Sequence, residues 1–74
     1  GTVHLAAGAL FVRAGDFEEA IPLLKEALGR ETLDAHRYLA DAYAALGREG
    51  ESRTHRAAYD AVKAARLRRG AGGQ

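Results

Sequence analysis

The sequence predicts an all-α protein, and three observations lead to this fold class. Ala, Leu, Arg and Glu dominate the 74 residues, and all four residue types form helices well. Val, Ile and Thr are few, and Pro22 is the one proline. Gly15, Gly29 and Gly47 each close an Ala- and Leu-rich stretch, as left-handed glycines do at the ends of helices. We therefore expect short helices separated by glycine turns.

Two helices are predicted in the first half of the chain. The first covers about residues 2–14. Asp16, with Glu19 three residues later, is typical of an N-cap and capping box at the start of the second helix. That helix ends before Gly29. Pro22 lies inside it and should remove one backbone hydrogen bond, which predicts a slight bend without a break.

Two further helices are predicted in the second half. The third covers about residues 32–46 and is capped by Thr32 or Asp34. The fourth covers about residues 51–69. Residues 70–74 offer little apolar surface to bury, which predicts a flexible tail. The four helices, joined by short loops, should run antiparallel.

The chain also resembles itself at one constant offset along the sequence. "AAGALFVRAGDFEEA" aligns with "YLADAYAALGREGES" without a gap. Equivalent positions pair small residues with small ones and aromatic with aromatic: Gly8 with Ala40, Phe11 with Tyr43, Gly15 with Gly47, and Ala20 with Ser52. Self-similarity at such a period indicates stacked helical hairpins.

At these residues the chain resembles the tetratricopeptide repeat (TPR), a helical hairpin with a period of about 34 residues. Ala20, Leu24 and Ala27 match the small–large–small pattern of the family's second helix. The resemblance implies one domain, residues 1–69, in which two antiparallel helix–turn–helix repeats form a short right-handed α-solenoid with an extended last helix. Repeat one covers about residues 2–30 and repeat two about residues 32–69.

The second repeat departs from the family pattern in its last helix. Arg56 stands where a large apolar residue is expected, and Tyr59 where a small one is expected. These departures predict that the fourth helix packs differently from the second, as a terminal capping helix with one polar face.

Catalytic and metal-binding patterns are absent from the sequence. It has no cysteine, no HExxH spacing and no glycine-rich phosphate loop between a strand and a helix. Ser52, the one serine, has no nucleophile elbow around it. His4, His36 and His55 are interpreted as packing or surface residues, with His55 hydrogen-bonded on the inner side of the fourth helix. We therefore expect a protein that is not an enzyme and needs no cofactor or metal.

Charge is divided unevenly along the chain. Residues 1–51 hold five Lys or Arg against nine Asp or Glu, whereas residues 52–74 hold six Lys or Arg against Asp60 alone. Cations near a helix C-terminus complement its dipole, which explains the basic end without a ligand. The alternative is binding of nucleic acid or an anionic surface by the last helix, which we disfavour because Tyr59 is the one aromatic among the basic residues.

The TPR resemblance implies a function in protein–protein interaction. In such arrays the first helices of the repeats line a groove that binds a peptide or a helical segment of another protein. Carried over by position, the groove residues here are Leu5, Ala9, Val12, Arg13, Arg37, Asp41, Ala44 and Ala45. Leu5 and Ala9 stand where the carboxylate-binding subfamily has Lys and Asn, and Asp41 would repel a carboxylate. An apolar or amphipathic segment therefore suits this groove better than a C-terminal carboxylate.

Self-association is the main alternative function. Two repeats are fewer than the three or so that usually form a stable core. The chain is therefore expected either to form a homodimer or to be part of a longer solenoid, and its Gly-Thr start without Met favours an excised domain. The abundance of Ala and Arg over Lys suggests a GC-rich bacterial genome. No apolar run is long enough to span a membrane, and we expect a cytoplasmic protein.

Overall fold

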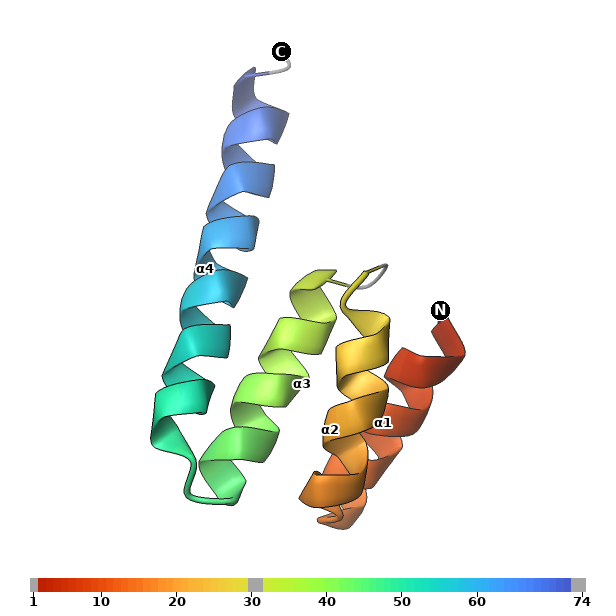
Figure 1. The fold of residues 1–74 in the computed structure, drawn as a ribbon. Coiled ribbons are helices and arrows are strands. Elements are labelled where there is room, and N and C mark those ends of the chain that lie inside the picture. Colours follow the sequence, from red (N-terminus) through yellow and green to blue (C-terminus); the bar gives the residue numbers. More distant parts are fainter. Residues whose placement is uncertain (1, 30–31, 73–74) are drawn as a thin grey trace.

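The computed structural model describes residues 2–29 and 32–72, and this part of the chain folds into four helices without a strand. The helices are α1 (Thr2–Ala14), α2 (Phe17–Ala27), α3 (Thr32–Ala45) and α4 (Glu49–Gly72). Successive helices run in opposite directions, with α3 between α2 and α4 (Figure 1). The predicted all-α class is confirmed. No helix among the described residues is long and apolar enough to cross a membrane.

The helix boundaries agree with the sequence predictions except in α4. Helix α4 begins at Glu49, two residues early, and continues to Gly72, so the predicted end at Arg68 or Arg69 is wrong. Ala, Leu and Arg before Gly70 are strong helix formers, and a single glycine costs a helix only about 1 kcal/mol. The rest of the predicted tail, residues 73–74, lies outside the described residues.

Helices α1 and α2 pack closely because glycine stands at their contact. A Cβ added to Gly8 would lie 2.6 Å from Leu24 Cδ2 and 2.8 Å from Leu24 Cγ. Leu24 is fully buried, as are Ala20 and Ala27 on the same face of α2. The small–large–small pattern read from the sequence therefore marks the buried face of α2.

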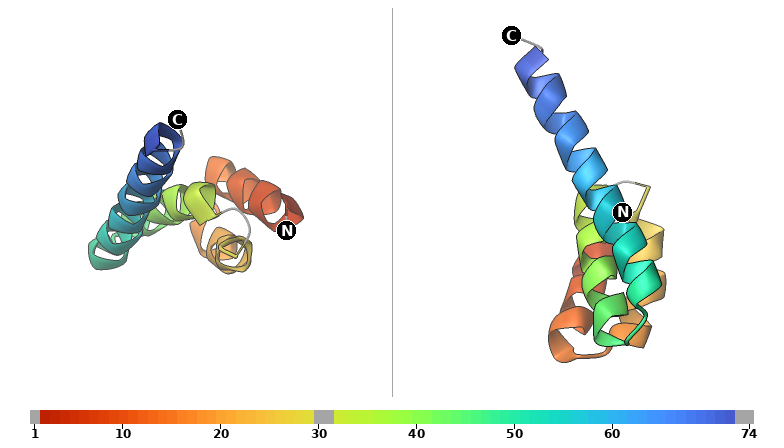
Figure 2. Two further views of the ribbon diagram at one scale, coloured as in Figure 1. Left: turned by 90° about the horizontal axis from the view of Figure 1, so that it is seen from above. Right: turned by 90° about the vertical axis from the view of Figure 1, so that its left-hand side faces the viewer.

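The buried hydrophobic residues that form the core come from α2 and α3. They are Ala20, Ile21, Leu24, Ala27, Ala35, Leu39, Ala40, Ala42 and Tyr43. Helix α1 contributes half-buried side chains at its edge, among them Leu5, Phe11 and Val12. Among the described residues α3 packs against α1, α2 and α4, whereas α4 contacts α3 alone. Figure 2 shows α3 in this central position.

The turns after α1 and α3 have the same backbone geometry, at positions that the self-alignment pairs. Gly15 and Gly47 have φ angles of 86° and 79°. The Gly15 N–H donates to the Val12 carbonyl and the Gly47 N–H to the Ala44 carbonyl, each at 3.1 Å. The next residue donates to the carbonyl of Phe11 in one turn and of Tyr43 in the other, each at 2.8 Å. Both turns are Schellman motifs, which confirms these two glycines as left-handed C-caps.

The cap predicted at Gly29 is wrong. Gly29 does not have a positive φ, and α2 ends on Leu28 in a right-handed conformation. The Leu28 carbonyl instead accepts a hydrogen bond from the Thr32 hydroxyl at 2.6 Å. A side chain of the next helix thus satisfies the last turn of α2 without a left-handed residue.

Asp16 is the N-cap residue of α2, as predicted, but the capping box predicted with Glu19 is not formed. The Asp16 side chain makes no capping hydrogen bond. Its backbone is already engaged, because its N–H donates to Phe11 and its carbonyl accepts from the Ala20 N–H. Thr32 and Asp34 lie inside α3, so they do not cap it, and residue 31 before it is outside the described residues. As predicted, α2 continues through Pro22 without a break.

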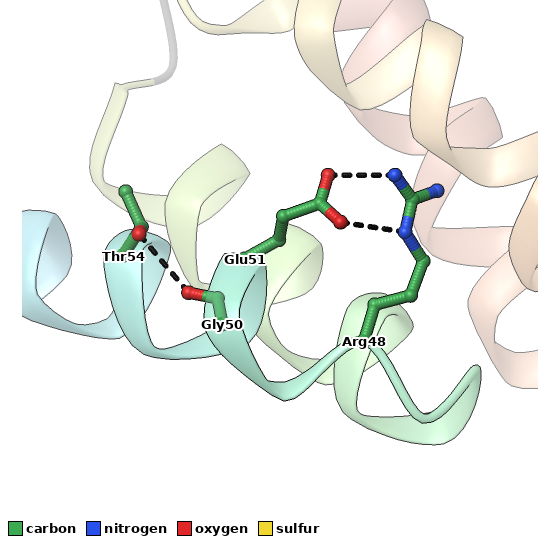
Figure 3. A network of polar contacts seen from close by, with 4 residues as sticks. All are labelled: Arg48, Gly50, Glu51 and Thr54. Atoms are coloured by element: carbon green, nitrogen blue, oxygen red, sulfur yellow. Dashed lines mark hydrogen bonds and ion pairs between the residues drawn. The ribbon is translucent and has the colours of Figure 1, made fainter.

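A polar network joins α3 to the start of α4. The Arg48 guanidinium makes two hydrogen bonds to the Glu51 carboxylate, of 2.6 and 2.8 Å, and the Thr54 hydroxyl donates to the Gly50 carbonyl (Figure 3). Arg48 also lies over the Tyr43 ring, 5.0 Å from its centroid. One turn further on, the buried Ser52 hydroxyl donates to the Ala40 carbonyl at 2.8 Å. The Ser52–Ala40 hydrogen bond and the Arg48–Tyr43 contact are the ones among these that connect α4 and the turn before it to α3.

The second half of α4 projects beyond α3. At 1.5 Å per residue, the 24 residues of α4 span about 36 Å and the 14 residues of α3 about 21 Å. The ribbon shows the C-terminal turns of α4 standing clear of the other helices (Figure 1). Leu67, on this projecting part, is 67% exposed.

The Gly8–Leu24 contact predicts opposite effects of alanine at two helical glycines. Gly8→Ala should lower the free energy of unfolding by about 1–2 kcal/mol, because overpacking against Leu24 outweighs the better helix propensity of alanine. Gly50→Ala, where a new Cβ meets nothing within 4 Å, should leave stability unchanged or raise it by up to about 1 kcal/mol. Urea unfolding followed by circular dichroism measures both. Equal effects of the two substitutions would contradict the close approach of α1 and α2.

Candidate functional site: the cavity between α3 and α4

The candidate site is a cavity of about 310 Å³ between α3 and α4. It is lined by Arg37, Ala40 and Asp41 of α3 and by Arg56 and Tyr59 of α4. Ala40 is buried, and the charged side chains are exposed. The cavity is therefore a small open cleft whose apolar base is surrounded by two guanidinium groups, one carboxylate and a phenol ring.

The cavity exists because α4 does not repeat the packing of α2. In the first hairpin, Leu24 and Ala27 are fully buried, and Leu24 packs beside Gly8 of α1. The equivalent residues of α4 are Arg56, which is exposed, and Tyr59, which is half-buried. A guanidinium loses too much hydration to enter an apolar interface unpaired. The predicted difference in the packing of α4 is thus observed, and the space it leaves is the cavity.

The charges around the cavity do not balance. Arg56 Nη2 lies 3.7 Å from Asp41 Oδ1 across the cleft, with both side chains more than half exposed. Arg37 lies over the ring of Tyr38, 4.9 Å from its centroid, and makes no ion pair among the described residues. One of the two cations therefore has no carboxylate partner here, which favours a ligand that carries an acidic group.

The predicted groove residues occupy three kinds of environment. Arg37 and Asp41 line the cavity. Leu5 and Val12 are half-buried and pack against the core, and Ala9 is half-buried on the same helix. Arg13, Ala44 and Ala45 are exposed on the surface. The cavity joins two of the predicted residues to α4, and the other six lie outside it.

Arg56 and Tyr59 were not among the groove residues predicted from the sequence. The available signal was their departure from the small–large–small pattern, because a polar or bulky residue at a packing position leaves space beside it. The pattern did not show on which side of α4 that space opens.

A second, apolar hollow of about 550 Å³ lies on the outer side of α1. Ala7, Leu10, Phe11 and Ala14 line it, with Asp16 at one end. Leu10 is 63% exposed, and Val3 on the same helix is 76% exposed. In α3 the positions equivalent to Val3, Ala7 and Leu10 are Ala35, Leu39 and Ala42, which are fully buried. The positions that are buried in α3 are thus exposed or half-buried on the outer face of α1.

The remaining polar groups are the histidines and the basic residues of α4. His55 is a hydrogen-bonded packing residue, as predicted, and its partner is His36 of α3. No group of three or more His, Asp or Glu side chains able to hold a metal ion occurs among the described residues. The cations of α4 are exposed, and Arg53 and Arg56 are in ion pairs with Glu49 and Asp41.

Comparison with known proteins adds no family assignment: no protein-family model, curated protein or solved structure matches this chain.

The origin of the cavity predicts that leucine at position 56 will partly close it. Arg56→Leu should raise the free energy of unfolding by about 1 kcal/mol, because apolar burial against Ala40 outweighs an exposed ion pair worth about 0–1 kcal/mol. Arg53→Leu, which breaks a similar exposed pair with Glu49, should change stability by about 0.5 kcal/mol or less. Urea unfolding compares the two. Equal effects would contradict this origin of the cavity.

Proposed function

We propose that this protein is a TPR-like protein-interaction module that binds a peptide or helical segment of another protein. Two equivalent turns support the repeat, since Gly15 and Gly47 make the same hydrogen bonds at aligned positions of the two hairpins. Buried small residues at equivalent positions, Ala20 and Ser52, support it further. We also propose, from the sequence, that the protein acts in the cytoplasm.

The observation that carries the proposal is the cavity lined by Arg37 and Asp41, two residues that the family resemblance assigns to a ligand groove. A volume of about 310 Å³ is at the lower end of the range for ligand sites and accommodates one or two side chains. We infer that a bound segment places an acidic side chain beside Arg37 and an apolar one against Tyr59 and Ala40. Its apolar face would continue over the exposed Ala44 and Ala45.

Self-association through α1 is the second candidate function. The observation that favours it is the exposure of Val3 and Leu10 at positions whose equivalents in α3 are buried. An uncharged helix face with small residues beside large ones allows two helices to approach closely, and a second copy placed about a two-fold axis would cover it.

The peptide-binding proposal is tested with a library of amphipathic helical peptides, each long enough for several helical turns. Peptides selected on the wild-type domain should carry an acidic residue beside an apolar one. Arg37→Glu should weaken their binding at least about tenfold, which is about 1.4 kcal/mol, because it places a carboxylate against the ligand's carboxylate. Arg66→Glu on the projecting part of α4 makes the same change in charge and should leave affinity within about twofold. Fluorescence anisotropy measures both.

Two other outcomes of the binding test would contradict the proposal. Loss of binding with Arg66→Glu but not with Arg37→Glu would overturn the cavity assignment and assign binding to the basic last helix. If the library yields no binder, the proposal fails. Self-association then becomes the favoured function, provided that light scattering finds a dimer that Leu10→Asp converts to a monomer.

A further inference from the structure

Two histidines meet at the contact between α3 and α4. His36 Nδ1 and His55 Nδ1 are 2.9 Å apart, and the ring centroids are separated by 5.1 Å. The His55 ring also stacks on the buried Tyr43 ring, with centroids 5.5 Å apart and planes within 10°. The pair therefore connects two helices through residues that are 19 positions apart in the sequence.

The hydrogen bond between these rings has a strict protonation requirement. One Nδ1 must carry a proton and the other must present a lone pair, so at least one of the two imidazoles must be neutral. If both rings are protonated, two N–H groups and two positive charges face each other at 2.9 Å. The same contact that attracts α4 to α3 at neutral pH then repels it.

Among the described residues, the charged groups around the pair do not neutralise a second positive charge. Lys25 of α2 adds positive charge near His55, and Glu51 of α4 opposes it. Glu51 is already paired with Arg48, and Tyr43 of α3 offers an uncharged ring. Helix α1 makes no contact with α4 among the described residues.

We propose that the His36–His55 pair is a proton-sensitive latch, which holds α4 against α3 when at least one imidazole is neutral and releases it when both are protonated. Release loosens α4 beyond Ser52, whose hydroxyl still anchors the first turns to the Ala40 carbonyl. The latch also adjoins the candidate site, because His36 and His55 are the sequence neighbours of Arg37 and Arg56, which line the cavity. Proton uptake would therefore alter the cavity as well as the docking of α4.

The direction of the pH dependence follows from His55. Burial, then the charges of His36 and Lys25, lower the pKa of His55 below its ordinary value of 6.5, and Glu51 opposes them. The unfolded chain therefore takes up this proton more readily than the folded protein. The free energy of unfolding should fall as the pH drops below 6.5 and should stop falling, as far as His55 is concerned, below its lowered pKa.

The test is urea unfolding of the full chain at two pH values, one unit above and one unit below the ordinary histidine pKa, at constant ionic strength. The equilibrium constant for folding of the wild type should fall several-fold between the two pH values. His55→Phe keeps an aromatic ring on Tyr43 and removes the titrating group, so most of that decrease should disappear. His4→Gln removes the histidine of α1 and serves as the matched control, which should retain the wild-type decrease.

The comparison uses the ratio between the two pH values, so a change in overall stability of a variant does not affect it. NMR titration supplies the second measurement, in which the amide shifts of residues 53–62 should move together with the imidazole signals of His36 and His55. A wild type without pH dependence in this window, a His55→Phe variant that keeps it, or amide shifts of α4 that ignore the two imidazoles would each overturn the proposal.

Discussion

Burial of the Tyr43 ring is the interaction on which the rest of this small structure depends. Tyr43 is the largest fully buried side chain, with 1% of its surface exposed. It packs in the core with Leu24 and Leu39, and it also stacks on His55 and lies beneath Arg48. Removing a buried aromatic ring costs about 3–5 kcal/mol in other proteins, against a total stability of about 5 kcal/mol for a small domain. The core and the docking of α4 therefore share one side chain.

The two hairpins differ in the contacts that hold their helices together. In the first, Gly8 allows Leu24 to approach the α1 backbone, and the interface is apolar. In the second, α4 is held by polar contacts of Ser52, His55 and Arg56, and a cavity remains beside them. Contacts between titratable groups are sensitive to protonation, whereas an apolar interface is not. We therefore assign binding and regulation to the α3–α4 interface, which is less densely packed.

Much of the fold could be predicted from the sequence, because helix patterning is local. Ala20, Leu24 and Ala27 revealed the buried face of α2 by their spacing, and Gly15 and Gly47 revealed two turns. The Gly29 cap and the Asp16 capping box were misread because each had a competing partner for the same backbone groups, the Thr32 hydroxyl in one case and the Phe11 carbonyl in the other. Such competition is decided by tertiary geometry, which a local pattern does not contain.

The candidate site was predictable only in part for the same reason. Position within the repeat pointed to Arg37 and Asp41, but the contribution of α4 to their cavity depends on how Arg56 and Tyr59 avoid the interface. The pairing of His36 with His55 depends on the angle at which α4 crosses α3, and no spacing in the sequence encodes it. The cavity arises because α4 packs differently from α2, and a repeat pattern describes only what the two helices share.

The central claim is that α3 holds the structure together through Tyr43, while α4 contacts only α3 within the described part of the chain. It is tested most directly by amide hydrogen exchange measured residue by residue by NMR at neutral pH. We predict the slowest exchange for residues 35–43 of α3, similarly slow exchange for the buried face of α2, and the fastest helical exchange for residues 63–69 of α4. Protection of residues 63–69 equal to that of α3, or protection of α1 greater than that of α3, would contradict the claim.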